Sequence, residues 1–143
     1  MAVTAPPKPR AGTAVAAGVL AVLGGLWFLT GIFWWTVVFG FGPLDLLVPG
    51  QIADAVIGLL LLLGGSTLLA RVEAGRVLCL AAGGLALVAL IVASVLRFQR
   101  ILFVVGGPTG IGEPVLRGLV TAAPFVALLV LAARPATRRW MRR

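Results

Sequence analysis

The chain alternates between long apolar runs and short polar connections. Four runs, at about 14–39, 52–70, 77–96 and 115–133, carry almost no charged residues. Each run is near the roughly 20 residues that an α-helix needs to cross the hydrocarbon core of a bilayer. The pattern therefore predicts an all-α fold, an integral membrane four-helix bundle.

The segments outside these runs complete the predicted organisation. Residues 1–13 form a short proline-rich leader, residues 14–133 hold the four spans, and residues 134–143 form a basic tail. The leader resembles the start of a secretory signal, but the first run continues far beyond the roughly 7–15 residues of a signal-peptide core. We expect that run to remain as a transmembrane helix or signal anchor.

Glycine and proline residues mark the expected helix ends. They are frequent between residues 40 and 50, so the second helix is expected to begin near Gln51. Asp54 would then lie in its first turn, where a carboxylate suits the helix dipole. Residues 71–76 are expected to form a tight turn, and residues 106–112 an irregular loop.

The distribution of basic residues predicts the orientation. With both termini inside, nine Lys and Arg residues fall on the inner side and three on the outer side. The positive-inside rule therefore places both termini in the cytoplasm of a multi-pass protein of the cell membrane. The inner set is Lys8, Arg10, Arg71, Arg76, Arg134, Arg138, Arg139, Arg142 and Arg143, and the outer set is Arg97, Arg100 and Arg117.

The net charge of +8 adds a prediction about partners. A strongly basic chain can bind nucleic acid, but basic residues that flank apolar spans also orient helices and bind anionic headgroups. We expect anionic lipid at the basic tail and no nucleic-acid partner.

The rare residue types argue against catalysis. Histidine is absent and Cys79 is the single cysteine. Neither a histidine-ligated haem, nor a typical zinc or copper site, nor a serine–histidine or cysteine-pair mechanism has support. We expect no enzyme activity, no metal and no cofactor.

Ionisable residues near the predicted outer face form the first candidate site. Glu113 and Arg117 are four residues apart in the favourable acid-first order. Ionisable groups at the edge of a span can line a substrate path or relay protons, or they can simply cap helices and pair with one another. The set is Asp54, Arg97, Arg100, Glu113 and Arg117.

Small residues recur on the first run and form the second candidate, a helix-packing face. Ala14 and Gly18 are four residues apart, as are Ala21 and Gly25. This spacing lets helix backbones approach closely. The face could pack inside the bundle, or it could contact another membrane subunit or a second copy of the chain.

Two segments carry a resemblance to a group of proteins. Residues 6–13, Pro-Pro-Lys-Pro-Arg-Ala-Gly-Thr, lead directly into an Ala/Val/Leu/Gly-rich run, and residues 74–78, Ala-Gly-Arg-Val-Leu, lead into the third run. In these features the chain resembles small, uncharacterised four-helix membrane proteins of high-GC actinobacteria. The resemblance implies the topology and assigns no functional residue.

These observations favour a non-catalytic role. A small chain with glycine-rich helix faces and few polar residues in its spans is expected to be an accessory or scaffold subunit that packs against larger membrane proteins. A small oligomeric channel or transporter that uses the region of Asp54 and Arg117 is the alternative, and a holin-like pore former is a third hypothesis.

Overall fold

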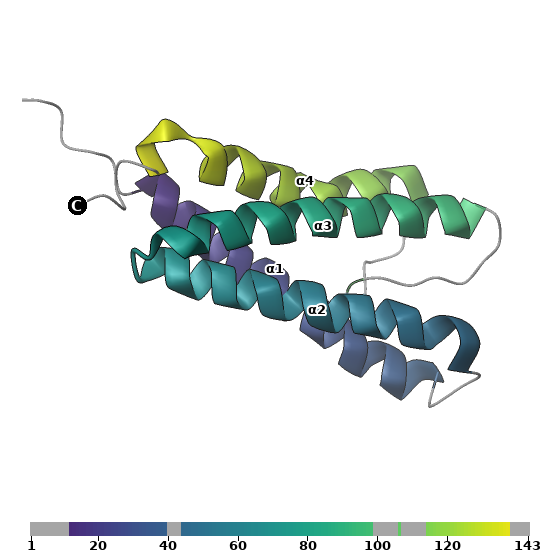
Figure 1. The fold of residues 1–143 in the computed structure, drawn as a ribbon. Coiled ribbons are helices and arrows are strands. Elements are labelled where there is room, and N and C mark those ends of the chain that lie inside the picture. Colours follow the sequence, from purple (N-terminus) through teal and green to yellow (C-terminus); the bar gives the residue numbers. More distant parts are fainter. Residues whose placement is uncertain (1–11, 40–43, 99–105, 107–113, 138–143) are drawn as a thin grey trace, which may run out of the picture.

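The structure, a computed structural model, describes residues 12–39, 44–98, 106 and 114–137, with the side chains of 35, 38–39, 44–48, 97–98 and 114–117 left out. Within these ranges the chain is helical and contains no strand (Figure 1), so the all-α prediction is confirmed. The helices are α1 (Gly12–Phe39), α2 (Leu44–Leu69), α3 (Glu73–Phe98) and α4 (Pro114–Ala133).

Sequential helices pack side by side, and α4 closes the bundle by packing against α1. The start of α1 and the end of α4 lie at the same end of the bundle, together with the turn that joins α2 to α3 (Figure 1). We call this the termini end and the opposite end the far end. From their shared turn, α2 and α3 diverge toward the far end (Figure 1).

Glycine lets the backbones of α1 and α2 approach closely. Gly18 lies against Gly65, and Gly25 lies against Gly58. A methyl group at Gly65 would stand 2.8 Å from the carbonyl oxygen of Gly18, and one at Gly25 would stand 2.8 Å from that of Gly58. On each helix the two glycines are seven residues apart, about two turns, so they share one face. The backbones of α1 and α2 are therefore in close contact at two levels of the bundle.

An aromatic cluster fills the centre of the bundle. The rings of Phe28 on α1 and Phe125 on α4 have centroids 5.5 Å apart, and Trp27 packs edge-on against Phe28 at 5.1 Å. Phe125 also fits over Gly24 of α1, whose missing side chain makes room for the ring. Leu61, among other leucines that are fully buried, continues this core.

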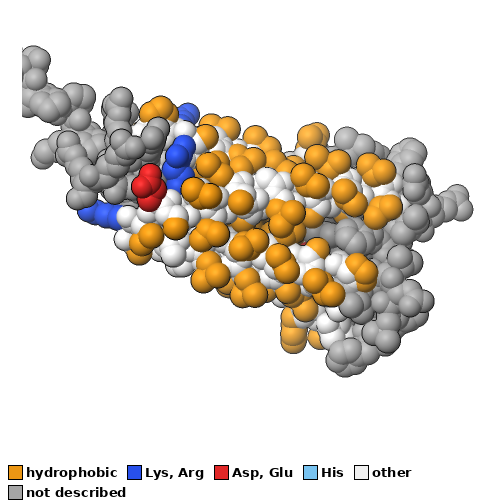
Figure 2. Space-filling model, in the orientation of Figure 1, with side chains coloured by type: hydrophobic (Ala, Val, Ile, Leu, Met, Phe, Trp, Pro, Cys, Tyr) orange, Lys and Arg blue, Asp and Glu red, His pale blue; other side chains and the backbone are white. Residues whose placement is uncertain are grey.

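The outer surface of the bundle is strongly apolar. Figure 2 shows hydrophobic side chains along the visible face, and the charged side chains visible on that face gather at the termini end. Three helical segments are long and apolar enough to cross a membrane: Gly12–Trp34, Pro49–Leu69 and Glu73–Leu96. The described apolar segment of α4, Gly118–Ala133, is shorter. The described surface is thus of the kind that lipid would cover.

The prediction that the second helix begins near Gln51 is wrong, because α2 begins at Leu44 and has Pro49 inside it. Proline removes one backbone hydrogen bond, but its fixed φ is compatible with a helix. Spanning helices tolerate such interruptions when neighbouring helices support them. Asp54 consequently lies ten residues after the helix start, about 15 Å along the axis, and not in the first turn.

The turn between α2 and α3 is also shorter than expected, because α3 already begins at Glu73. Arg71 adopts a φ of +64°. Its N–H donates to Leu68 O at 3.1 Å, and the N–H of Val72 donates to Thr67 O at 2.9 Å. This is a Schellman motif with arginine at the position where glycine is usual.

Candidate functional site

Asp54 is a buried carboxyl group inside the apolar segment of α2. Its side chain is 1% exposed, and it lies within the segment Pro49–Leu69. Ionisable residues at such positions are costly to bury, and they mark ion or substrate pathways by default. The residue therefore stands out from the leucine-rich sequence that surrounds it.

The backbone of Gly106 contacts this carboxyl group. The Gly106 N–H donates to Asp54 Oδ1 at 2.8 Å, and Gly106 is itself buried. Its φ of +86° lies in the left-handed region that favours glycine. A methyl group at this position would overlap the ring of Trp27. Trp27 and Asp54 thus meet at Gly106, which comes from the connection between α3 and α4.

The second carboxyl oxygen has a different environment. Asp54 Oδ2 is buried and has no hydrogen-bond partner among the residues that the structure describes. An unpaired polar atom in such a place costs free energy, and an unpaired charge costs more. One oxygen of the carboxyl group is therefore held by the Gly106 N–H, and the other has no hydrogen-bond partner among the described residues.

Polar side chains continue from Asp54 toward the far end. Gln51 lies three residues before Asp54, so the two share one face of α2. Gln51 Nε2 donates to Thr36 Oγ1 on α1 at 3.3 Å, and Thr36 donates to Ile32 O at 2.7 Å. We call Thr36, Gln51 and Asp54 the polar track. It joins α1 and α2 in a region that is otherwise apolar.

Toward the termini end, the helices are sealed by apolar packing. Ile57 and Leu61, at one and two turns beyond Asp54, are buried, and so is Phe28 on α1. The Gly25–Gly58 contact lies on the same side of Asp54. Gln51 and Thr36 therefore lie on the far-end side of Asp54, whereas its described neighbours toward the termini end are apolar.

The side chains of the other members of the predicted polar set lie outside the described part of the structure. Arg97 lies in α3 and Arg117 in α4, but their side chains are outside the described part of the structure. Arg100 and Glu113 lie entirely outside the described residues. Of that set, Asp54 alone has a described environment.

The predicted helix-packing face lies inside the bundle. Ala14 and Ala21 are fully buried, and Gly18 and Gly25 lie against α2. A methyl group on Gly65 would also stand 3.0 Å from the Ala21 Cβ. Within the monomer, α2 therefore covers the small residues of α1.

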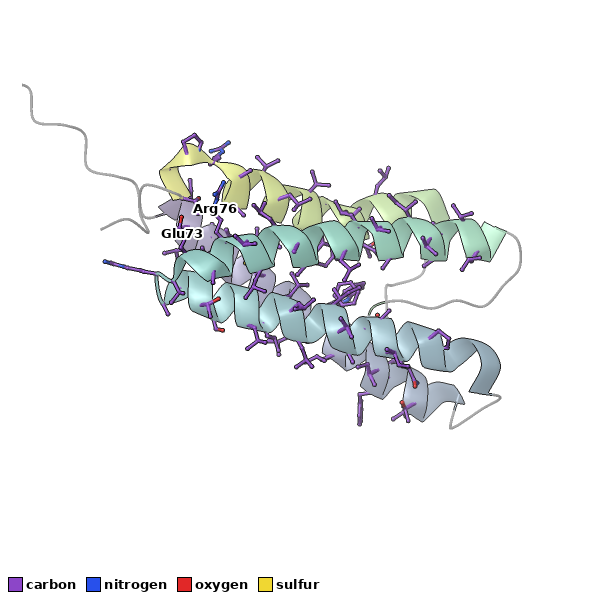
Figure 3. All side chains as sticks on the ribbon, in the orientation of Figure 1. Glu73 and Arg76 are labelled. Carbon is purple, nitrogen blue, oxygen red and sulfur yellow. The ribbon has the colours of Figure 1, made fainter. Side chains whose placement is uncertain are left out.

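The termini end holds a separate group of charged residues. Arg76 Nε donates to Ala132 O at 2.8 Å, and Figure 3 shows its side chain reaching from the start of α3 toward α4. Glu73 lies in the first turn of α3, where the helix dipole favours an acidic group. Buried Thr137 donates from Oγ1 to Leu131 O at 2.7 Å. These contacts cap the last carbonyls of α4, and we assign them a structural role.

Sequence reasoning missed the partners of Asp54. Gly106 was expected only as part of an irregular loop, and Trp27 only as part of the first run. The spacing of Gln51 and Asp54 on α2 was the one available signal, because residues three apart on a helix are neighbours. Nothing in the sequence indicated that Gly106 would be buried against a residue 52 positions earlier.

Comparison of the chain with protein-family models, with curated proteins and with solved structures gives no match. The chemistry of the described residues is likewise limited. They contain no group of three or more His, Cys, Asp or Glu that could hold a metal ion, and the free Cys79 is buried.

Proposed function

We propose that the chain is a non-catalytic, multi-pass protein of the cell membrane with its termini end in the cytoplasm. Support comes from the three apolar segments of spanning length and from the apolar exterior (Figure 2). The described basic residues Arg71, Arg76 and Arg134 come from the termini end, as the positive-inside rule requires of a cytoplasmic side.

Cysteine labelling tests this orientation. Cys79 is replaced by alanine, and a single cysteine is then introduced at Glu73 or, in the connection between α1 and α2, at Gly42. A membrane-impermeant maleimide should label the Gly42→Cys variant in intact cells and the Glu73→Cys variant only after lysis. The reverse pattern would overturn the orientation.

Within this topology, we infer that the chain is a small transporter of an ion or an ion-coupled solute. The observation that carries the proposal is the Oδ2 atom of Asp54, buried in a spanning segment without a hydrogen-bond partner among the described residues. A buried carboxyl group in a spanning segment costs free energy, and residues that break the local pattern at such a cost are expected at functional sites.

The surroundings of Asp54 support a carrier more than an open pore. In the polar track, Thr36 and Gln51 lie on the far-end side of Asp54, whereas the buried apolar side chains of Ile57 and Leu61 lie on its termini-end side. A site that is reached from one side at a time is the arrangement an alternating-access carrier needs. The described core offers no polar continuation toward the termini end.

Current measurements test the transport proposal. Purified protein is reconstituted in liposomes on a solid-supported membrane and exposed to concentration jumps of H⁺, Na⁺, K⁺ and Cl⁻. We expect a transient current with at least one ion, abolished by Asp54→Asn and retained by Glu73→Gln, the matched acid-to-amide control at the exposed start of α3. Currents of equal size in the wild type and in Asp54→Asn would remove Asp54 from the transport path.

An accessory role is the second candidate, and one observation favours it. A methyl group at Gly84 would meet nothing within 4 Å, because Gly84 faces outward on α3 beside exposed Leu85 and Val88. A small residue on an outward apolar face lets another helix approach closely. Purification in mild detergent tests this role: a partner subunit that is retained with the wild type and lost from Gly84→Leu supports it.

A further inference from the structure

The number of free oxygen atoms at Asp54 limits what the site can bind. Oδ1 already accepts the Gly106 N–H at 2.8 Å, which leaves Oδ2 as the available atom. A ligand that needs a single oxygen atom fits this arrangement.

A metal cation needs several ligands. Ca²⁺ takes about six to eight oxygens, and Mg²⁺ about six in near-ideal octahedral geometry. The described residues place no second acidic side chain with Asp54 in a metal-binding group. The hydroxyl groups of Thr36, Ser94 and Thr121 each donate to a carbonyl of their own helix. Among the described residues, Asp54 therefore has no acidic partner with which to hold a metal ion.

No described charged group other than Asp54 occupies this part of the bundle. On α2, the nearest polar side chain is Gln51, which is neutral. The sequence of α1 contains no ionisable side chain. On α3 and α4, the described charged side chains, Glu73 and Arg76, lie at the termini end, and those of Arg97 and Arg117 are outside the described set. Among the described residues, therefore, no cation lies beside the Asp54 carboxylate to balance its charge.

We propose that the ligand of Asp54 is a proton, which is carried on Oδ2. An O–H bond forms at Oδ2 when a hydronium ion on the far side breaks one of its own O–H bonds and becomes water. The Oδ2–H bond breaks when a water molecule accepts the proton and becomes hydronium, which leaves the carboxylate. The neutral carboxyl group suits its apolar surroundings, and the Gly106 N–H holds Oδ1 in both states. This inference rests on the proposed transport role and names the ion that the site takes.

Carbodiimide labelling tests the inference without requiring transport. A hydrophobic carbodiimide, dicyclohexylcarbodiimide, adds to protonated carboxyl groups in apolar sites, and mass spectrometry of the detergent-purified full chain locates the adduct. We expect modification of Asp54 at a rate that falls as the pH rises. The rate should be unchanged when NaCl, KCl or CaCl₂ replaces choline chloride at constant ionic strength. Asp54→Asn should lose the adduct, and Glu73→Gln should keep it.

Three outcomes separate this inference from the proposed function. Slowing of the modification by Na⁺, K⁺ or Ca²⁺ at fixed pH would make a metal ion the ligand and overturn the inference, while leaving transport intact. An Asp54 that reacts at no pH, or at a rate independent of pH, would also overturn it. Labelling as expected, together with currents that do not depend on Asp54, would support the proton site and overturn the transport role.

Discussion

Gly25 on α1 and Gly58 on α2 lie in backbone contact. A methyl group at Gly25 would stand 2.8 Å from Gly58 O, and one at Gly58 would stand 3.1 Å from Gly25 O. Two helices can approach this closely only where both lack a side chain. The contact lies about one turn from Asp54 along α2, so it also fixes the distance between the helices beside the candidate site.

Gly25→Ala should therefore destabilise the bundle. A Cβ under 3.0 Å from a carbonyl oxygen forces the helices apart, and overpacking of this kind costs about 1–3 kcal/mol. Thermal unfolding in detergent, followed by circular dichroism, measures the loss. Gly84→Ala is the control, because a methyl group there meets nothing within 4 Å and removes a flexible residue from a helix. A lower thermal midpoint for Gly84→Ala than for Gly25→Ala would contradict the close packing of α1 against α2 at Gly25.

Arg76 should hold the end of α4 in place. Its Nε–H···O bond to Ala132 is 2.8 Å long and satisfies a carbonyl at the end of that helix, and hydrogen bonds of charged groups are worth about 1.5–3 kcal/mol. Arg76→Gln should speed hydrogen exchange of the backbone amides in residues 131–137, measured by mass spectrometry. Arg134→Gln removes the same charge from an exposed side chain at the same end and should change that exchange less.

Gly106→Ala should disrupt the contact with Asp54. The φ of +86° disfavours any side chain, and the new methyl group would overlap the Trp27 ring. We expect a lower thermal midpoint in detergent. Trp27→Leu removes the overlap but not the backbone strain. Gly106→Ala should therefore lower the thermal midpoint less in the Trp27→Leu background than it does in the wild type. Losses that simply add would mean that Gly106 and Trp27 do not interact.

The sequence predicted the helices better than it predicted the site. Apolar runs of spanning length identify helices because the backbone must satisfy its own hydrogen bonds in lipid. The ends of those helices were less predictable. Pro49 and Gly50 are typical of a loop, yet α2 continues through them, and this moves Asp54 from the helix start to a buried position.

The contacts of Asp54 could not have been inferred from local pattern. The Gly106 bond spans 52 positions of sequence and depends on how one connection meets two helices. Arg71 gives a similar lesson at the termini end. Its left-handed φ completes a Schellman motif, and glycine is the usual residue at this position. Because arginine stands there, the sequence does not indicate the motif.

The initial rate of proton uptake into liposomes is the most direct test of the proposal that Asp54 carries protons across the membrane. Vesicles that contain the purified chain and the pH-sensitive dye pyranine receive a potassium diffusion potential, negative inside, through valinomycin. We expect acidification by the wild type and by Glu73→Gln, and a loss of at least tenfold in rate for Asp54→Asn. The amide is nearly isosteric and keeps an oxygen that can accept the Gly106 N–H, so the fold should survive. Proton uptake by Asp54→Asn at the wild-type rate would contradict proton transport through Asp54.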